Sequence, residues 1–439
     1  MKLFVRILAA FMSALCALSA SFAAEAGVGD AALLDALVAK GILTEDEAFE
    51  IKKEQSEILV DVPDSVAGMR LYGFLHMRYS YVGHDFTGLA GESRFNIRRF
   101  STVMIIDTSE NSELMACMTM PSACPFDSLY WAANFDGDII SGKFKFGYSA
   151  VNFVVEDIDS ASIIKGIDRS ILCPYFGGGD SGYDGYIKTE YGSALGFAGK
   201  HLGLRWNGDI PDLNGFIYSL GLTNSKPRDY NYRYDNGISC WLGVGYETKR
   251  EEWSLRFISN FGYADKIVSA VDESAPLPAP MVGFGDTFGV NTYLLFDYGD
   301  FELQSEFMLA SVRYGASRSS DRPYYTSNSP TAVPWGVYVM GSYKLLKLDG
   351  IGEFEPVLRY TYLDTDGRGV RGKDVVYGMS SEGLYDRARA YYAGVNWYVN
   401  GKYLKYSLGW ERFEFFDKPL GGNARSVSDA VIAQIQIFF

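Results

Sequence analysis

Apolar and polar residues alternate along most of this chain, beginning near Met69. In Met69–Tyr81 apolar side chains occupy the odd positions, whereas Arg70 and Arg78 are among the even ones. An alternation of period two is typical of β-strands with one apolar and one polar face. The same pattern recurs in segments that begin at Trp253, Phe301, Tyr391 and Leu404. The sequence therefore predicts a long all-β region.

Tight turns and long polar connections both separate these strands. Gly299-Asp300 and Asn400-Gly401 predict short hairpins, because such residues tolerate positive φ. Long polar stretches occur at Ser170–Tyr183, Asp265–Gly285 and Arg313–Pro334. Short turns at one end and long loops at the other are typical of transmembrane barrels. A soluble sandwich also alternates, but the polar faces here carry charges of both signs, which a dry core would not bury unpaired.

The last nine residues form the sharpest single feature. In Val431–Phe439 the odd positions are apolar, and Gln434 and Gln436 lie on the other face. An amphipathic final strand that ends in Phe resembles the signal by which outer-membrane barrels are recognised for insertion. The length from position 68 onward allows about 16 strands of roughly 10 residues with their connections. We therefore expect a transmembrane antiparallel β-barrel of about 16 strands, preceded by a short N-terminal helical segment.

The N-terminus predicts export. Lys2 and Arg6 precede the apolar run Ile7–Leu18, and Ser21-Phe22-Ala23 offers small residues for cleavage. This arrangement is typical of a secretory signal peptide. We therefore divide the chain into a signal peptide (1–23), a periplasmic helical segment with its linker (24–62) and an outer-membrane barrel (63–439).

The segment before the barrel has a helical pattern. Leucine and valine recur at helical spacing around Leu37, Gly41 ends the first helix, and Thr44 with Glu47 forms a capping box for a second. A hairpin of this size is too small to be a domain alone. It is either a trimerising or cell-wall-facing extension or a mobile tail, and the sequence leaves both open.

Composition and charge narrow the classes further. The net charge is −14, which argues against a nucleic-acid partner. Beyond the first 20 or so residues, no apolar run approaches the roughly 20 residues that a transmembrane helix needs. Three histidines and the cysteines left after cleavage show no metal-ligand spacing, so we expect no metal and no cofactor. Cys117 and Cys124 are close enough for a disulfide, and free thiols are the alternative.

Several segments resemble the phosphate-selective porin family, known as porin O and P. They are the leader around Lys40–Ala48, the double-arginine strand Phe95–Phe100, the stretches Gly142–Gly147, Gly352–Tyr360 and Gly394–Tyr398, and the last strand. The likeness covers nearly the whole mature chain except its loops. The resemblance implies a 16-stranded, trimeric barrel in the outer membrane of a Gram-negative-type bacterium, with a channel for passive diffusion of small ions and polar solutes.

Selective members of that family use arginines and lysines in the lumen, where charged donors replace the hydration of an anion. The strand pattern gives a set of charged pore-lining candidates here: Arg70, Arg78, Arg98, Lys143, Lys145, Arg256, Arg359, Glu302 and Glu306. Glu353 and Glu411 are further inward acids. For each arginine the sequence leaves two roles open. It is either a salt-bridge partner in the lumen or at the rim, or a contact for the solute. Arg99 is expected to face away from Arg98, and we expect Arg98 and Arg359 to bias the pore modestly toward anions.

Other functions use different residues. A barrel enzyme needs a nucleophile with a base or a pair of carboxylates, and the chain has no G-x-S-x-G elbow and few histidines. We therefore expect no enzyme. The expected function is an outer-membrane porin for the passive diffusion of small hydrophilic solutes. A preference for phosphate or other anions is part of this expectation. A sugar-selective porin and a structural barrel with a plugged lumen are the alternatives.

Overall fold

The computed structural model describes the barrel and most of its connections. The described residues are 68–84, 92–120, 126–159, 163–177, 198–224, 237–265, 284–314, 331–348, 351–367, 370–371, 384–401, 403–417 and 425–439. All of them lie in one compact unit, Asp61–Phe439. The expected signal peptide and the helical segment 24–62 lie outside the described residues. Cys117 is buried and free, so for this cysteine the structure shows the free thiol, and Cys124 lies outside the described residues.

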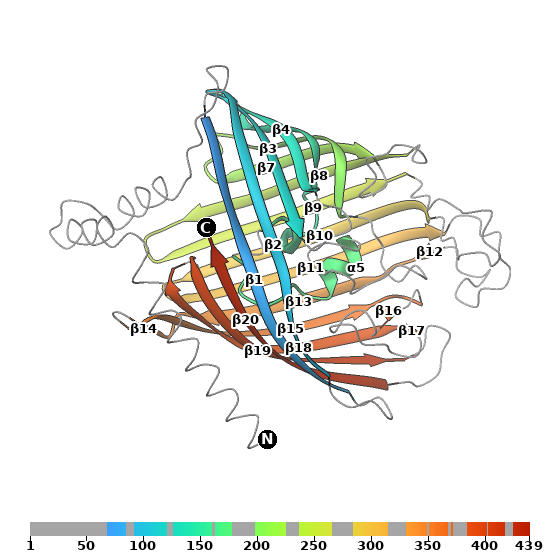
Figure 1. The fold of residues 1–439 in the computed structure, drawn as a ribbon. Coiled ribbons are helices and arrows are strands. Elements are labelled where there is room, and N and C mark those ends of the chain that lie inside the picture. The colour runs from blue at the N-terminus through green and yellow to red at the C-terminus, as the bar shows by residue number, and fades with distance from the viewer. Residues whose placement is uncertain are drawn as a thin grey trace. The chain divides into compact units, whose positions relative to one another are not determined.

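Strands dominate the described residues (Figure 1). The first group is β1 (Gly68–His84), β2 (Glu92–Ser109), β3 (Ser112–Met120), β4 (Phe126–Asp136), β5 (Ser141–Ala150), β6 (Lys200–Asp209), β7 (Phe216–Asn224), β8 (Ile238–Lys249), β9 (Trp253–Ala264) and β10 (Phe284–Tyr298). The second group is β11 (Phe301–Tyr314), β12 (Thr331–Ala332), β13 (Trp335–Tyr343), β14 (Leu346–Leu348), β15 (Gly352–Asp364), β16 (Val370–Arg371), β17 (Leu384–Tyr385), β18 (Arg387–Asn400), β19 (Leu404–Phe416) and β20 (Arg425–Phe438).

The main sheet is closed into a barrel. It contains 18 strands, and β1 pairs antiparallel with both β2 and β20. β12, β13 and β14 are successive pieces of one crossing, because β12 and β13 both pair with β11 and β13 and β14 both pair with β15. The wall therefore has 16 crossings, which confirms the predicted fold. β16 and β17 form a separate two-stranded ribbon.

The two ends of the barrel differ in their connections. Turns of a few residues join β2 to β3, β8 to β9, β10 to β11 and β18 to β19. Longer connections, such as those after β5, β7, β9, β11 and β15, lie at the other end. The first and last barrel residues, Gly68 and Phe439, belong to the short-turn end. The predicted alternation of short turns and long loops is confirmed.

Side chains alternate between the two faces of the wall. On β1, His76 and Arg78 are buried inside the barrel, whereas Met77 and Tyr81 are exposed outside it. The exposed outer side chains are mostly large and apolar, as a lipid-facing surface requires. Aromatic pairs lie near strand ends on this surface, for example Phe354 with Trp397, Tyr360 with Tyr391, and Tyr79 with Phe95.

A β-bulge changes the alternation on β2. His76 pairs with Arg99 but Met77 pairs with Ile97, so Arg98 is an extra residue in the register. Arg98 and Arg99 are each only 8% exposed. Arg99 shares the inner face with His76, and Arg98 reaches an acid inside the barrel. The expectation that only one of the two arginines points inward is therefore wrong.

The connection between β5 and β6 folds into the barrel. Its described parts include residues 151–159 and 163–177, which contain the short helices α4 (Val155–Ile158) and α5 (Leu172–Gly177) and are largely buried. We call residues 151–159 and 163–177 the inward loop. The stretch that begins at Ser170 was expected to be an external loop, but Ser170–Gly177 lies within this buried segment. Among the described residues, no helix is long and apolar enough to cross a membrane.

An apolar core lies inside the barrel where α5 meets the wall. Leu172, Tyr175 and Phe176 of α5 are fully buried. They belong to one cluster with inward wall residues that include Met308, Ala310, Val312, Tyr338, Leu363, Ala388, Ala390, Phe413, Phe415 and Ile432. The expectation of a polar inner face is wrong here, because the apolar side chains of α5 need an apolar wall, and its alanines leave room for them.

Candidate functional site

Asp168 of the inward loop is held by two wall arginines. Arg78 Nη1 and Nη2 donate to the two oxygens of Asp168 at 2.7 and 2.9 Å. Arg98 Nε lies 3.6 Å from the same carboxylate. Gln434 of β20 accepts two further hydrogen bonds from Arg78. This bidentate, buried arrangement fixes the loop against the seam between β1 and β20.

Arg359 is the centre of a second buried cluster. Its Nη2 lies 2.9 Å from Glu411 on β19, and its Nη1 lies 3.4 Å from Glu156 on α4. Nη1 also donates to the Asp168 carbonyl oxygen at 2.7 Å. The guanidinium lies over the ring of Tyr392, 5.3 Å from its centroid. Arg359 therefore joins the wall to two separate points of the inward loop.

A third contact holds the middle of the loop. Lys165 Nζ lies 2.6 Å from Glu355 and 3.2 Å from Glu302. Burial alone would lower the pKa of Lys165, but the two carboxylates outweigh it and the net shift is upward. Asn396 donates to the Lys165 carbonyl oxygen at 2.9 Å, and Lys405 donates to that of Ile164 at 3.2 Å.

The start of α4 is held by Glu306. The Val155 N–H donates to Glu306 Oε1 at 2.7 Å, and Asn291 donates to the same oxygen at 2.6 Å. Glu156 accepts hydrogen bonds from the backbone and hydroxyl of Ser170, which ties α4 to the residues before α5. Burial raises the pKa of Glu156, although Arg359 and the bonds from Ser170 oppose the shift.

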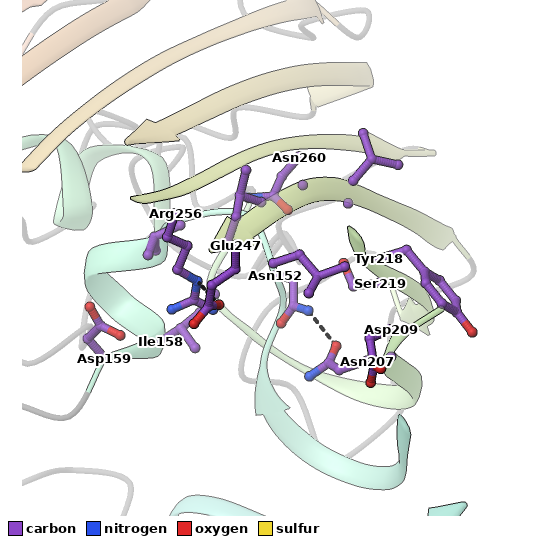
Figure 2. A pocket seen from close by; sticks show the side chains of 17 residues that line it. Asn152, Ile158, Asp159, Asn207, Asp209, Tyr218, Ser219, Glu247, Arg256 and Asn260 are labelled. Atoms are coloured by element: carbon purple, nitrogen blue, oxygen red, sulfur yellow. Dashed lines mark hydrogen bonds and ion pairs between the residues drawn. The ribbon is translucent and has the colours of Figure 1, made fainter. Parts of the chain in front are cut away.

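These contacts divide the barrel interior. We call the inner wall from β11 through β20 to β2, with the inward loop packed on it, the filled side. We call the inner wall of β5–β9 the open side. On the open side a cavity of about 310 Å³ lies between the loop and β6–β9. Figure 2 shows Arg256 beside Glu247 and, between Glu247 and Tyr218, Asn152 bonded to Asn207.

A basic patch lies on the inner wall next to this cavity. We define it as Arg70, Lys143, Lys145 and Arg205, with the acids Asp107 and Glu113. Arg70 and Lys143 both pair with Glu113, at 3.4 and 2.6 Å, and Arg70 also pairs with Asp107 at 3.1 Å. Lys145 lies over the Tyr130 ring at 5.0 Å, and Arg205 donates to backbone carbonyls. Among the described residues, neither Lys145 nor Arg205 has a carboxylate within ion-pair distance.

The structure places all nine predicted pore-lining residues on the inner wall but separates them into groups. One group contacts or braces the inward loop: Arg78, Arg98, Arg359, Glu302 and Glu306. A second belongs to the basic patch: Arg70, Lys143 and Lys145. Arg256 alone lines the cavity. Of the further predicted acids, Glu411 binds Arg359, and Glu353 lies 3.8 Å from Lys344.

Sequence reasoning missed several residues that define the site. They are Arg99, Arg205, Glu156, Lys165, Asp168, Arg169 and the asparagines that line the cavity. Arg205 lies on an alternating strand, so its inward position was available from the pattern. The residues of the inward loop show no regular alternation of apolar and polar positions. Nothing local in the sequence indicates that this connection enters the barrel.

A closed antiparallel barrel with an apolar outer wall, a charged interior and a loop folded into it defines the class: an outer-membrane channel. The family model for phosphate-selective porin O and P matches residues 98–410. The chain therefore belongs to the phosphate-selective porin O and P family, as its residues predicted, and is an outer-membrane porin. No curated protein is significantly similar in sequence.

Solved outer-membrane proteins share the fold. The outer membrane channel DcaP of Acinetobacter baumannii is 11% identical, covers 86% of this chain and 99% of its own, and superposes with a TM-score of 0.51. An anion-selective porin from Comamonas acidovorans is 12% identical, covers 84% of this chain and 99% of its own, also with a TM-score of 0.51. At these identities the likeness supports the barrel architecture alone.

Proposed function

We propose that this porin is a passive diffusion channel with a modest preference for anions, including phosphate, and no catalytic activity. The observation that supports it best is the basic patch. Four cations there face two carboxylates, and the charged neighbours of Lys145 are Lys143, Arg205 and Glu113. The excess of positive charge attracts anions to the inner wall beside the cavity. The anion-selective porin of Comamonas acidovorans is consistent with such a preference in this fold.

We assign the proposed anion preference to other residues than the two arginines expected from the sequence. Arg98 and Arg359 were expected to bias the pore, but both are buried and bound to carboxylates or carbonyls of the inward loop. A charge that is neutralised in a dry cluster contributes little to the field in a neighbouring aqueous space. We therefore assign the bias to the basic patch and test it at Lys145, which has no carboxylate within ion-pair distance among the described residues.

Planar-bilayer recordings test this proposal. The wild-type reversal potential in a KCl gradient, and in potassium phosphate, should lie on the anion-selective side. Lys145→Gln should shift it toward cations, because one inward positive charge is lost. Arg250→Gln, which removes the same charge from the exposed turn between β8 and β9, is the matched control and should shift it less. A cation-selective wild type, or equal shifts in both variants, would contradict the assignment.

We also propose that the chain is exported with cleavage of residues 1–23, that residues 24–62 lie outside the barrel, and that three barrels associate in the lipid. The helical period of the segment, which precedes the first strand, supports the second point. Removing residues 24–62 from the mature chain should leave a β-rich, conducting barrel, measured by circular dichroism and bilayer recording. Loss of β-structure would show that the segment belongs to the barrel. Crosslinking in detergent tests the trimer.

A further inference from the structure

The cavity on the open side carries charges of both signs. Its lining includes the acids Asp159, Asp209 and Glu247 and a single cation, Arg256. Asp159 comes from the inward loop, and the others come from the wall strands β6, β8 and β9. A bare anion would meet three carboxylates and one guanidinium in this space. The lining therefore does not suit phosphate, although the basic patch nearby attracts anions.

Arg256 and Glu247 are paired only loosely. Arg256 Nε lies 3.4 Å from Glu247 Oε2, and this buried nitrogen donates no hydrogen bond within the described part of the chain. The side chains are 40% and 56% exposed, whereas that of Arg359 on the filled side is 1% exposed. Both charged groups of the Arg256–Glu247 pair can therefore bind a solute, and a weak, wet ion pair costs little to exchange.

Neutral groups that can donate and accept hydrogen bonds continue the lining. Asn207, Ser219, Gly243 and Asn260 occupy successive paired positions across β6–β9. Asn152 of the inward loop donates to Asn207 at 2.5 Å. Gly243 leaves room at this level, because a Cβ there would overlap the Ser219 hydroxyl and lie 2.5 Å from Asn260 Oδ1. We call these five residues the amide belt.

We propose that this cavity binds small zwitterionic solutes, molecules that carry one ammonium and one carboxylate group, such as amino acids. Arg256 receives the carboxylate through its planar pair of N–H donors. Glu247 and Asp159 receive the ammonium, and the amide belt replaces part of the hydration of the rest of the solute. The inference rests on the proposed channel function and names a solute class for it.

The lining favours a zwitterion over the other solute classes. A lone anion gains one cation and faces three acids, and a lone cation is repelled by Arg256. A neutral solute uses the amide belt but leaves both charges unused. Only a solute with both charges satisfies Arg256 and Glu247 together. The contacts are solvent-exposed and weak, which allows the solute to leave on the far side, as conduction requires.

Swelling of proteoliposomes with two isomeric solutes tests this. Glycine is a zwitterion and glycolamide is its uncharged isomer, so size and mass are matched. We expect glycine to enter about threefold faster than glycolamide, since exposed charge contacts are individually weak. Glu247→Gln and Arg256→Gln should each bring the ratio of the two entry rates close to one. Glu251→Gln, in the exposed turn of the same hairpin, should keep the wild-type ratio.

The glycolamide rate separates the possible failures. No swelling with either solute would overturn the channel function itself. Equal entry of glycine and glycolamide through an open wild-type channel would overturn the zwitterion site alone. A wild-type preference for glycine that persists in both Glu247→Gln and Arg256→Gln, with normal barrel yield, would place the selectivity elsewhere and overturn the assignment to this cavity.

Discussion

The filled side and the open side of the barrel interior both carry arginines and carboxylates, but these residues have different roles on the two sides. On the filled side, Arg78 and Arg359 are almost fully buried, and each receives a carboxylate from the inward loop. Arg359 also receives the Glu411 carboxylate from the wall. On the open side, Arg256 is 40% exposed, and its one ion-pair partner in the described part of the chain is Glu247 at 3.4 Å. The difference lies in what the loop brings to each arginine. An inward arginine in this barrel is therefore not by itself a solute contact.

The surroundings decide how much each charge pair contributes. A buried pair loses hydration on both partners, so removing one partner leaves an uncompensated charge and costs about 3–5 kcal/mol. An exposed pair is screened by water and typically contributes less than about 1 kcal/mol. The filled side therefore holds the inward loop in place, while the open side leaves its charges available. Changes at Phe439, Arg359, Gly336 and Gly243 test this contrast, beginning with the largest effect.

Both sides depend on the seam where β1 meets β20. The Phe439 N–H donates to the Gly73 carbonyl oxygen at 2.9 Å, the reverse bond is 2.7 Å, and the Phe439 ring stacks on Phe100 at 5.9 Å. Deleting Phe439, or the change Phe439→Asp, should sharply lower the amount of heat-modifiable barrel in the outer membrane, with aggregated or degraded periplasmic protein. Normal barrel levels in both variants would show that the last residue is dispensable for assembly.

The next largest effect should come from Arg359. Arg359→Met leaves Glu156 and Glu411 buried without their cation, so the free energy of unfolding should fall by about 3–5 kcal/mol. Arg256→Gln, the matched change on the open side, should cost less than about 1 kcal/mol. Denaturant titration of the refolded barrels, followed by tryptophan fluorescence, measures both. Equal costs would show that the two sides do not differ in this way.

The decrease in the free energy of unfolding caused by Arg359→Met should depend on pH. Burial raises the pKa of Glu156 in the folded protein, and removing Arg359 removes an influence that opposes the shift. A carboxyl with a raised folded-state pKa favours folding at low pH, and that contribution disappears as the pH rises through the raised pKa. The variant should therefore be least destabilised at acidic pH. A cost that grows on acidification would contradict the role given to Glu156.

The strands could be predicted from the sequence, because each carries the period of two that a one-sided wall imposes. The inward positions of Arg78, Arg359 and Glu306 follow from it, and so does the final strand. Arg98 and Arg99 could not be resolved, since a bulge adds one residue without any local signal. The partners of these arginines come from the inward loop, whose path is set by tertiary contacts such as those of Asp168. The ion pairs between the wall arginines and the inward loop could therefore not be predicted from the sequence.

The smallest effect should come from two glycines that face the lumen on opposite sides. A Cβ at Gly336 of β13 would overlap Leu172 of α5 and lie 2.8 Å from the Tyr362 carbonyl oxygen. Neither the packed helix nor the backbone can move freely, so Gly336→Ala should cost about 1–3 kcal/mol and make the inward loop more sensitive to protease. A cost near zero would show that α5 is not tightly packed on the wall.

Gly243→Ala is the counterpart on the open side. Its Cβ would displace only the ends of Ser219 and Asn260, and both side chains border the cavity. They can turn into that space, so the free energy of unfolding should change by less than about 1 kcal/mol. The added methyl group narrows the cavity at the amide belt, and the same variant should therefore slow solute entry in the swelling assay. A large loss of stability with unchanged entry would reverse the contrast, because it would show that the open side is packed like the filled one.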